Sequence, residues 1–164
     1  MIEFLNIYEK PAYYEQALFL YKNSMKYLDD DYAMDGYSLE EYLEKLVNTT
    51  LFYVIVDDNR VCGCVYLDNI IGDSKNLHSA EITACIDKNC WGVFSKICAI
   101  LFLNFCFEKL GFKKIKALVY PENYRVKTLL EFAGFEFEAL LKGETIRNNK
   151  LQDIEIYSCR KAEK

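Results

Sequence analysis

The stretch Phe107–Phe135 decides the fold and reads FEKLGFKKIKALVYPENYRVKTLLEFAGF. One helix is expected to end at Gly111 and another at Gly134, because glycine readily takes the left-handed conformation that closes a helix. Each glycine is followed by a phenylalanine that opens an apolar, strand-like run. A short strand is predicted up to Tyr120, after which Pro121-Glu122-Asn123 opens the second helix. The stretch therefore predicts a helix–strand–helix–strand unit.

Upstream of this unit, the sequence predicts a strand over residues 2–8 and a helix from Pro11 to about residue 27. Ser38-Leu-Glu-Glu41 is a capping box, because the serine can bond the amide of Glu41 while that glutamate reaches back. A second helix is expected to follow it. The apolar runs 51–56 and 61–67 predict a hairpin around a turn at residues 57–60.

Further along, a loop is expected over residues 70–76, a strand over 78–86 and another loop over 87–92. The helix predicted over 93–110 is apolar nearly all round, so it should be buried against a sheet. Strands at 135–141 and 151–157 flank a turn at Asn148-Asn149. The order β-α-α-β-β-β-α-β-α-β-β predicts an α/β fold, a mixed sheet with helices on its faces.

The length of 164 residues predicts one domain, 1–164, and a hydrophobic content of 52% is ample for a core. The net charge of −5 disfavours binding to nucleic acid, which needs a basic surface. Mild acidity is compatible with a cationic substrate, and equally with an ordinary soluble surface.

The N-terminal MIEFLNIYEK has neither the basic head nor the apolar run of a signal peptide. The longest apolar run, Ile97–Leu103, is far shorter than a membrane span. The seven cysteines are odd in number and mostly lie in apolar segments, which indicates buried thiols in a reducing, cytoplasmic setting. No cysteine spacing fits a zinc site, and His78 is the sole histidine.

The predicted order resembles that of the GCN5-related N-acetyltransferases (GNAT superfamily), which implies the acyl-CoA N-acyltransferase fold. In that fold the mixed sheet is strongly bent and its fourth and fifth strands are splayed where the cofactor enters. The similarity is greatest to the ribosomal-protein alanine N-acetyltransferase branch. Any one motif is weak, but the order and spacing are specific. The motifs are Val61–Leu67 with its glycine, Ala80-Glu81-Ile82, Pro121-Glu122-Asn123, Glu131, Gly134-Phe135, and the tail with Asp153, Tyr157-Ser158 and Arg160.

The resemblance implies acetyl-CoA as cofactor and direct attack of an amine on its thioester. Pyrophosphate would meet the amides at the start of the helix after the fourth strand. The residues implied there are Gly92, Val93, Phe94, Ser95 and Lys96, and the pantetheine arm would pair with Ala84, Cys85 and Ile86. Asn123 would bond the pantetheine amides, or serve as a helix N-cap, or do both.

This loop departs from the family pattern. It is one residue short, and Val93 stands where a glycine is expected. Lys96 can compensate as a cation facing phosphate, or simply be solvated. The tyrosine acid of many members is replaced by Leu130, and the serine common in the nearest branch by Val126.

Glu81 is the candidate general base, since it matches a glutamate of the histone-acetyltransferase version of this strand. The alternative is a glutamate paired with a lysine. His78 points to the opposite face of a regular strand and is expected to be a surface residue. The acidic segment Asp29–Asp35 either draws a cationic amine or is a solvated helix end.

Two functions remain open. The first is an acetyl-CoA-dependent N-acetyltransferase acting on a primary amine, either a small molecule or a protein N-terminus. The second is a non-catalytic GNAT-like module that binds a partner, which Val93, Leu130 and Val126 favour. A homodimer is compatible with either function, and no membrane partner is expected.

Overall fold

The structure is a computed structural model that describes residues 1–162, and the chain forms two compact units. The first unit comprises Met1–Asp68, Thr83–Trp91 and Ile146–Lys150. The second comprises Asn69–Ile82, Gly92–Thr145 and Leu151–Lys164.

The strands hydrogen-bond in the order β1-β2-β3-β4-β5-β7-β6. Their bounds are β1 Ile2–Asn6, β2 Leu51–Asp57, β3 Arg60–Gly72, β4 Leu77–Ile86, β5 Lys114–Val119, β6 Glu136–Arg147 and β7 Lys150–Arg160. Since β4 and β5 are parallel while β1–β2, β2–β3 and β5–β7 are antiparallel, the sheet is mixed. The α/β class and the predicted element order are confirmed.

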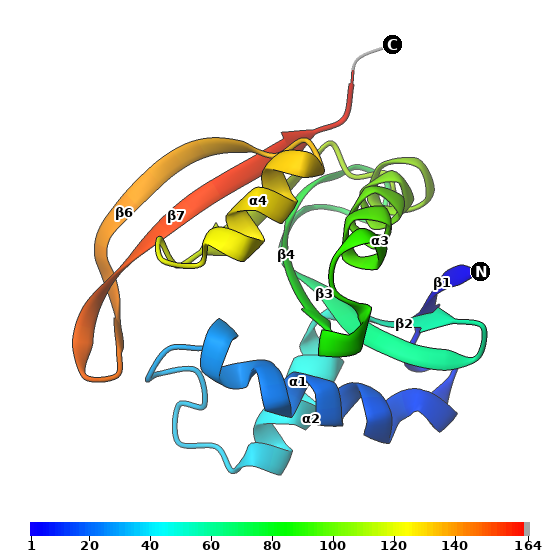
Figure 1. Cartoon of the computed structure of the whole chain (residues 1–164), viewed down its shortest axis with the longest axis horizontal. Helices are drawn as coiled ribbons and strands as arrows, with labels where there is room; N and C mark the ends of the chain where they lie inside the picture. The colour runs from blue at the N-terminus through cyan, green and yellow to red at the C-terminus, as the bar shows by residue number, and fades with distance from the viewer. Residues whose placement is uncertain (163–164) are drawn as a thin grey trace. The chain divides into compact units, whose positions relative to one another are not determined.

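The helices are α1 Tyr14–Leu28, α2 Leu39–Thr49, α3 Val93–Asn104 and α4 Tyr124–Phe132. Short helical turns lie at Pro11–Tyr13, Lys88–Cys90 and Phe105–Leu110. In the first unit, α1 and α2 lie next to each other (Figure 1), and residues of both pack with β2 and β3 in one apolar cluster. The largest fully buried side chain of that cluster is Tyr21.

Local signals predicted the ends of these elements well. The Glu41 amide donates to Ser38 Oγ at 3.3 Å and the Ser38 amide to Glu41 Oε2 at 2.8 Å, which confirms the capping box of α2. Gly111 and Gly134 close their helices with φ of 89° and 92°. These glycines are needed because other residues rarely adopt such angles.

Strands β6 and β7 form one long hairpin (Figure 1), and both extend beyond the predicted bounds 135–141 and 151–157. Its tip, part of the first unit, turns through Asn148 and Asn149 at φ of 51° and 58°. Their amides donate to the two carboxylate oxygens of Asp31, each at 2.9 Å. The Arg147 guanidinium donates to the Lys26 carbonyl at 2.7 Å, so the tip is held by the last turn of α1 and by the segment that follows it.

Two predicted boundaries were wrong. Residues 70–72, expected in a loop, continue strand β3 to Gly72, and only 73–76 form the connection to β4. The helix expected to run unchanged to Leu110 widens into a π-helical turn over Phe105–Leu110, in which amides bond five residues back.

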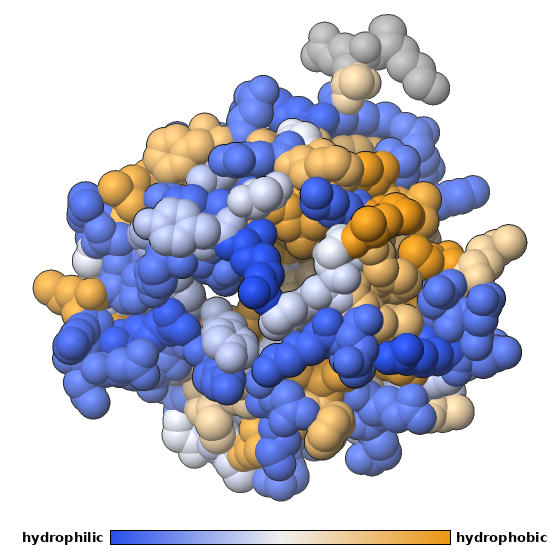
Figure 2. Space-filling view, viewed as in Figure 1, coloured by the Kyte–Doolittle hydropathy of each residue, from blue (hydrophilic) through white to orange (hydrophobic). Residues whose placement is uncertain are grey.

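The helix predicted over 93–110 was expected to be buried against a sheet, but α3 is buried along one side only. Cys98, Phe102 and Leu103 are buried, whereas a second stripe faces solvent: Val93, Ile97, Ile100 and Leu101 are 73%, 47%, 40% and 40% exposed. Apolar side chains gather over α3 on the face seen in Figure 2. A helix packed along one side leaves its other side to solvent, whatever the residues there.

Candidate functional site

The parallel pairing of β4 and β5 is short. It runs from Ser79 opposite Lys114 to Glu81 opposite Lys116, after which no further pair of these strands is recorded in the described part of the chain. Strand β4 nevertheless continues to Ile86 and β5 to Val119. The pairing of the two strands therefore ends at Glu81, the predicted general base.

Both oxygens of Glu81 are hydrogen-bonded within the second unit. The Lys116 ammonium lies 2.9 Å from Oε1, and the Asn69 side-chain amide donates to Oε2 at 2.8 Å. The lysine pair that the sequence left open as an alternative is thus present. The carboxylate is fixed in place, and its role as a base stays a prediction. His78 is exposed, as expected.

The first turn of α3 is where the sequence predicts the pyrophosphate site. Gly92 precedes it with φ 94° and ψ −125°, a conformation open to glycine alone. No side chain of the described residues caps this helix. The Lys96 amide donates to the Gly92 carbonyl at 3.3 Å, whereas the amides before it have no acceptor within the helix. Such amides, with the helix dipole, attract phosphate.

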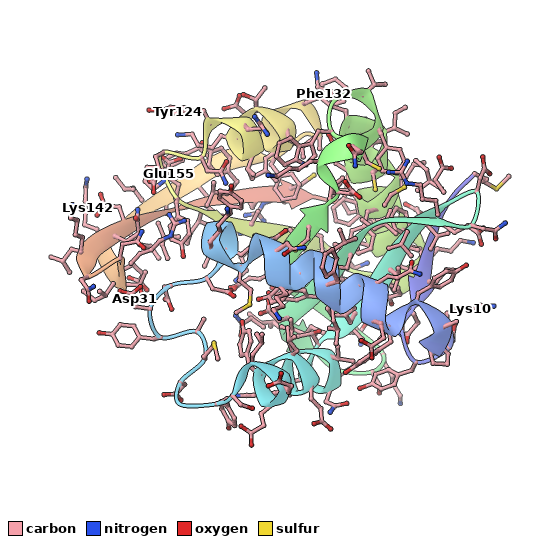
Figure 3. The ribbon with its side chains drawn as sticks, turned by 60° about the horizontal axis from the view of Figure 1, so that its bottom comes forward. Lys10, Asp31, Tyr124, Phe132, Lys142 and Glu155 are labelled. Atoms are coloured by element: carbon pink, nitrogen blue, oxygen red, sulfur yellow. The ribbon has the colours of Figure 1, made fainter. Side chains whose placement is uncertain are left out.

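Three residues of this turn, Val93, Ser95 and Lys96, have defined surroundings in the structure. Val93 is the first helical residue, and its side chain points to solvent. Ser95 Oγ donates back to the Gly92 carbonyl at 2.9 Å. The Lys96 ammonium lies 4.7 Å from the ring centroid of Phe132, which Figure 3 shows on α4. Lys96 therefore makes a cation–π contact, rather than being simply solvated.

Asn123 is the N-cap of α4, because its Oδ1 accepts from the Val126 amide at 3.3 Å. The NH2 group of the same side chain remains as a donor for a ligand. Leu130 is buried and Val126 is half-buried, so neither position supplies a hydroxyl group.

One cluster of the second unit was not found from the sequence. The Lys127 ammonium lies 3.0 Å from Glu155 Oε2 and also bonds the Pro121 carbonyl at 3.1 Å. The Tyr157 hydroxyl donates to Glu155 at 3.1 Å. The Lys127 ammonium also lies 5.1 Å from the ring centroid of Tyr124, and Figure 3 labels both Glu155 and Tyr124. The hydrogen bond with Glu155 raises the pKa of Lys127. No local pattern connects Lys127 with Glu155, 28 residues away.

In the first unit, the segment Ala84–Ile86 is the end of β4. A Cβ added to Gly63 of β3 would lie 2.4 Å from the Cys85 carbonyl oxygen, which explains the glycine of that strand. Ala84 is exposed. The Trp91 indole donates to the Ile86 carbonyl at 2.9 Å, so that carbonyl already has a partner.

The acidic segment after α1 is not simply a solvated helix end, because Asp29 is half-buried. The Tyr21 hydroxyl lies 3.0 Å from each of its oxygens and 2.9 Å from the Tyr42 hydroxyl. Burial raises the pKa of Asp29 to about 6, although its hydrogen bonds with the two tyrosines act in the opposite direction. Sequence patterns could not reveal this contact, because the two tyrosines lie on separate helices.

The described helices include none that is both long and apolar enough to cross a membrane. Six of the seven cysteines are buried free thiols, as predicted, and Cys159 is half-buried.

Comparison with known proteins agrees with this architecture. The family model described as "Acetyltransferase (GNAT) domain" matches residues 5–136. The probable N-acetyltransferase YjcK of Bacillus subtilis (strain 168) is 28% identical over 149 residues, which cover 87% of this chain and 81% of that protein.

Solved structures are similar over nearly the whole chain. Spermidine N-acetyltransferase from Vibrio cholerae, in complex with CoA and spermine, has a TM-score of 0.76 and 24% identity over 97% of this chain and 95% of that one. Ribosomal-protein-S5-alanine acetyltransferase from Vibrio fischeri has a TM-score of 0.72 and 17% identity over 97% and 91%. At these identities they show a shared fold. Because the family model covers more than half of the sequence, we conclude that the chain belongs to the GNAT acetyltransferase family.

Proposed function

We propose that this protein is an acetyl-CoA-dependent N-acetyltransferase that acetylates a primary amine. The observation that supports it most is the uncapped first turn of α3 behind Gly92, in a chain of the acetyltransferase family. A small amine or a protein N-terminus would be the acceptor, since the names of similar proteins include both a spermidine and a ribosomal-protein enzyme. The buried thiols support a reducing, cytoplasmic location.

The cofactor would supply the acetyl group as a thioester. In the second unit, the amides of residues 93–95 would hold its pyrophosphate with Lys96 as a nearby cation, and the NH2 group of Asn123 would bond its pantetheine arm. In the first unit, backbone groups of residues 84–86 would pair with the same arm, with Ala84 exposed for this contact. Because a thiol has an ordinary pKa of about 8.5, its release does not require an acid at Val126 or Leu130.

Glu81 is the base proposed from the sequence. Its carboxylate is fixed by Lys116 and Asn69, and a fixed carboxylate orients a cationic amine well. To accept a proton from that amine, it would have to exchange one of these two partners.

A second function, a non-catalytic binding module, has support of its own. The exposed stripe of α3, formed by Val93, Ile97, Ile100 and Leu101, offers apolar surface to a partner. In the same unit, Leu130 and Val126 are apolar where the family pattern implies hydroxyl-bearing residues. Such a module need not bind the cofactor, so cofactor binding separates the two functions.

The deciding experiment is thermal unfolding with and without millimolar acetyl-CoA. A ligand at about 100 times its dissociation constant stabilises a fold by about 2.7 kcal/mol, which raises the midpoint by a few degrees in a domain of this size. We expect such a rise. A folded protein whose midpoint does not move would contradict the enzyme and favour the binding module.

Three variants locate the effect. Val93→Glu should abolish the shift, because it places a negative charge beside the proposed pyrophosphate site, and Val93→Gly should enlarge it. Leu151→Glu is the matched control. It adds the same charge to an apolar side chain of the same unit that is 75% exposed, against 73% for Val93, and should leave the shift intact.

A further inference from the structure

The turn between β5 and α4 is tied to strand β7 by side chains of the second unit. The Lys127 ammonium donates to the Pro121 carbonyl at 3.1 Å and lies 3.0 Å from Glu155 Oε2 and 3.2 Å from Oε1. Beside it, the Gln152 side-chain amide donates to Glu122 Oε2 at 3.3 Å. Two consecutive residues of the turn are therefore held from β7. We call the contact of Lys127 with Glu155 and the Pro121 carbonyl the clamp.

The register of the strands and the direction of the helix bring the partners of the clamp together. Strand β7 runs antiparallel to β5, and Glu155 stands opposite Val119, the last residue of β5. Lys127 lies in the first turn of α4. Because side chains of a helix point back toward its N-terminus, Lys127 reaches the turn that precedes the helix.

The clamp is largely shielded from solvent, and its donors are all used. The side chains of Lys127 and Glu155 are 19% and 15% exposed. The ammonium has three protons for the Pro121 carbonyl and the two oxygens of Glu155. The Tyr157 hydroxyl donates to Glu155 at 3.1 Å. Since partly buried charges are screened less than exposed ones, this pair fixes the turn more firmly than a surface ion pair would.

The clamped turn ends at Asn123, the residue proposed to bond the pantetheine arm. Its amide donates to the Tyr120 carbonyl at 2.9 Å, and its Oδ1 accepts from the Val126 amide at 3.3 Å. The NH2 group is left as a donor for a ligand. A donor that is already in place when the ligand arrives binds it more tightly, because less ordering is needed at that moment.

We propose that Lys127 is a positioning residue for acetyl-CoA. Through the Pro121 carbonyl it fixes the turn, so that the NH2 group of Asn123 meets the pantetheine arm. Lys127 itself need not touch the cofactor, since its donors are already used. The inference rests on the proposed acetyl transfer. Loss of the clamp should therefore weaken binding of the cofactor and leave the chemical step unchanged.

Calorimetric titration of the full chain with CoA tests this without catalysis. Lys127→Met keeps an unbranched side chain of similar size and should raise Kd by about 3–10-fold, the value of one hydrogen bond. Asn123→Asp removes the NH2 donor but keeps a capping oxygen, and should raise Kd by a similar factor. Because Lys127 acts through Asn123, the double variant should bind about as well as either single variant.

Lys114→Met is the matched control. Lys114 lies 2.6 Å from Glu138 in the same unit, and its side chain is 14% exposed, close to the value for Lys127. It opens β5, whereas the clamped turn follows the other end of that strand. This variant should bind CoA like the wild type. Glu155→Gln loosens the clamp from the side of β7 and should raise Kd, which carries the test if Lys127→Met fails to fold.

Two further measurements separate positioning from general stability. With spermidine, or with a peptide that begins with alanine, Lys127→Met should raise KM for acetyl-CoA about 3–10-fold while kcat changes little. In the protein without cofactor, the Val126 amide, which bonds Asn123, should exchange its hydrogen faster in Lys127→Met than in Lys114→Met.

Several results would overturn the positioning role. Unchanged CoA binding by folded Lys127→Met, or factors that multiply in the double variant, would contradict a role through Asn123 while acetyl transfer stands. An equal loss of affinity in Lys114→Met would reduce Lys127 to a residue of general stability. If the wild type itself binds no CoA, the positioning role falls together with the proposed function.

Discussion

At the scale of a residue, Gly63 sets how closely β3 approaches β4 in the first unit. An added Cβ would lie 2.4 Å from the Cys85 carbonyl oxygen and 3.2 Å from the Ile86 Cα. Both are backbone atoms that cannot swing away. Gly63→Ala should therefore lower the free energy of unfolding by about 1–3 kcal/mol, measured by urea denaturation.

Gly143→Ala is a suitable comparison. Its added Cβ would meet only the Leu151 side chain at 3.7 Å, but its φ of 57° is strained for alanine. Backbone strain alone costs about 1–2 kcal/mol. If Gly63→Ala left the free energy of unfolding unchanged in the same titration, the close approach of β3 to β4 at Gly63 would be contradicted.

At the scale of an element, α2 depends on its capping box. Ser38→Ala removes the acceptor for the Glu41 amide, and loss of such a cap costs about 1 kcal/mol of stability. Thr49→Ala at the other end of the helix is the control, since its hydroxyl only bonds the Lys45 carbonyl one turn back. Equal midpoints of Ser38→Ala and Thr49→Ala in thermal unfolding would argue against the cap.

The same scale explains what could be predicted from the sequence. The Ser38 cap, the stops at Gly111 and Gly134 and the turn at Asn148-Asn149 are local, because each depends on residues within one turn of chain. The exposed stripe of α3 depends on which side the sheet packs, and composition carries no such information. The lysine beside Glu81 was foreseen only as a type of partner, since Lys116 lies 35 residues away.

The Asp29 cluster shows the limit most clearly. Its hydroxyls come from Tyr21 of α1 and Tyr42 of α2, and each was assigned an ordinary place in its own helix. Only the packing of the two helices brings these tyrosines together beside Asp29. The cofactor residues expected from the resemblance stay predictions, whereas the contact of Tyr21 and Tyr42 with Asp29 follows from packing that no local pattern encodes.

At the scale of the whole molecule, Asp29 gives stability a distinctive dependence on pH. Burial disfavours the charged form of Asp29, and its pKa therefore rises from 3.8 in an unburied aspartate to about 6 in the folded protein. Its contribution to stability is full below about pH 4 and is lost as pH rises to about 6, because the unfolded chain releases the proton first. Carboxyls whose pKa is lowered, such as Glu138 beside Lys114, act in the opposite direction.

The difference in unfolding free energy between wild type and Asp29→Asn measures the contribution of the Asp29 carboxyl to stability at each pH. We expect the wild type to lose stability relative to the variant between about pH 4 and about pH 6, in urea titrations at each pH. The difference in unfolding free energy between wild type and Asp35→Asn should change little over the same pH range. A flat result for Asp29→Asn as well would mean that the carboxyl is not buried in solution.

The hydrogen bonds between Asp31 and the β6–β7 tip also determine when the first unit can be completed during synthesis. Asp31 and its partners Asn148 and Asn149 are 117 and 118 positions apart. A ribosome adds about 5–20 residues per second, so the acidic segment waits on the order of ten seconds for the hairpin that completes its unit. During that interval the first unit is unfinished, although most of its residues have already emerged. Its assembly is therefore a late event of synthesis, and the nascent chain is most exposed to chaperones and proteases before then.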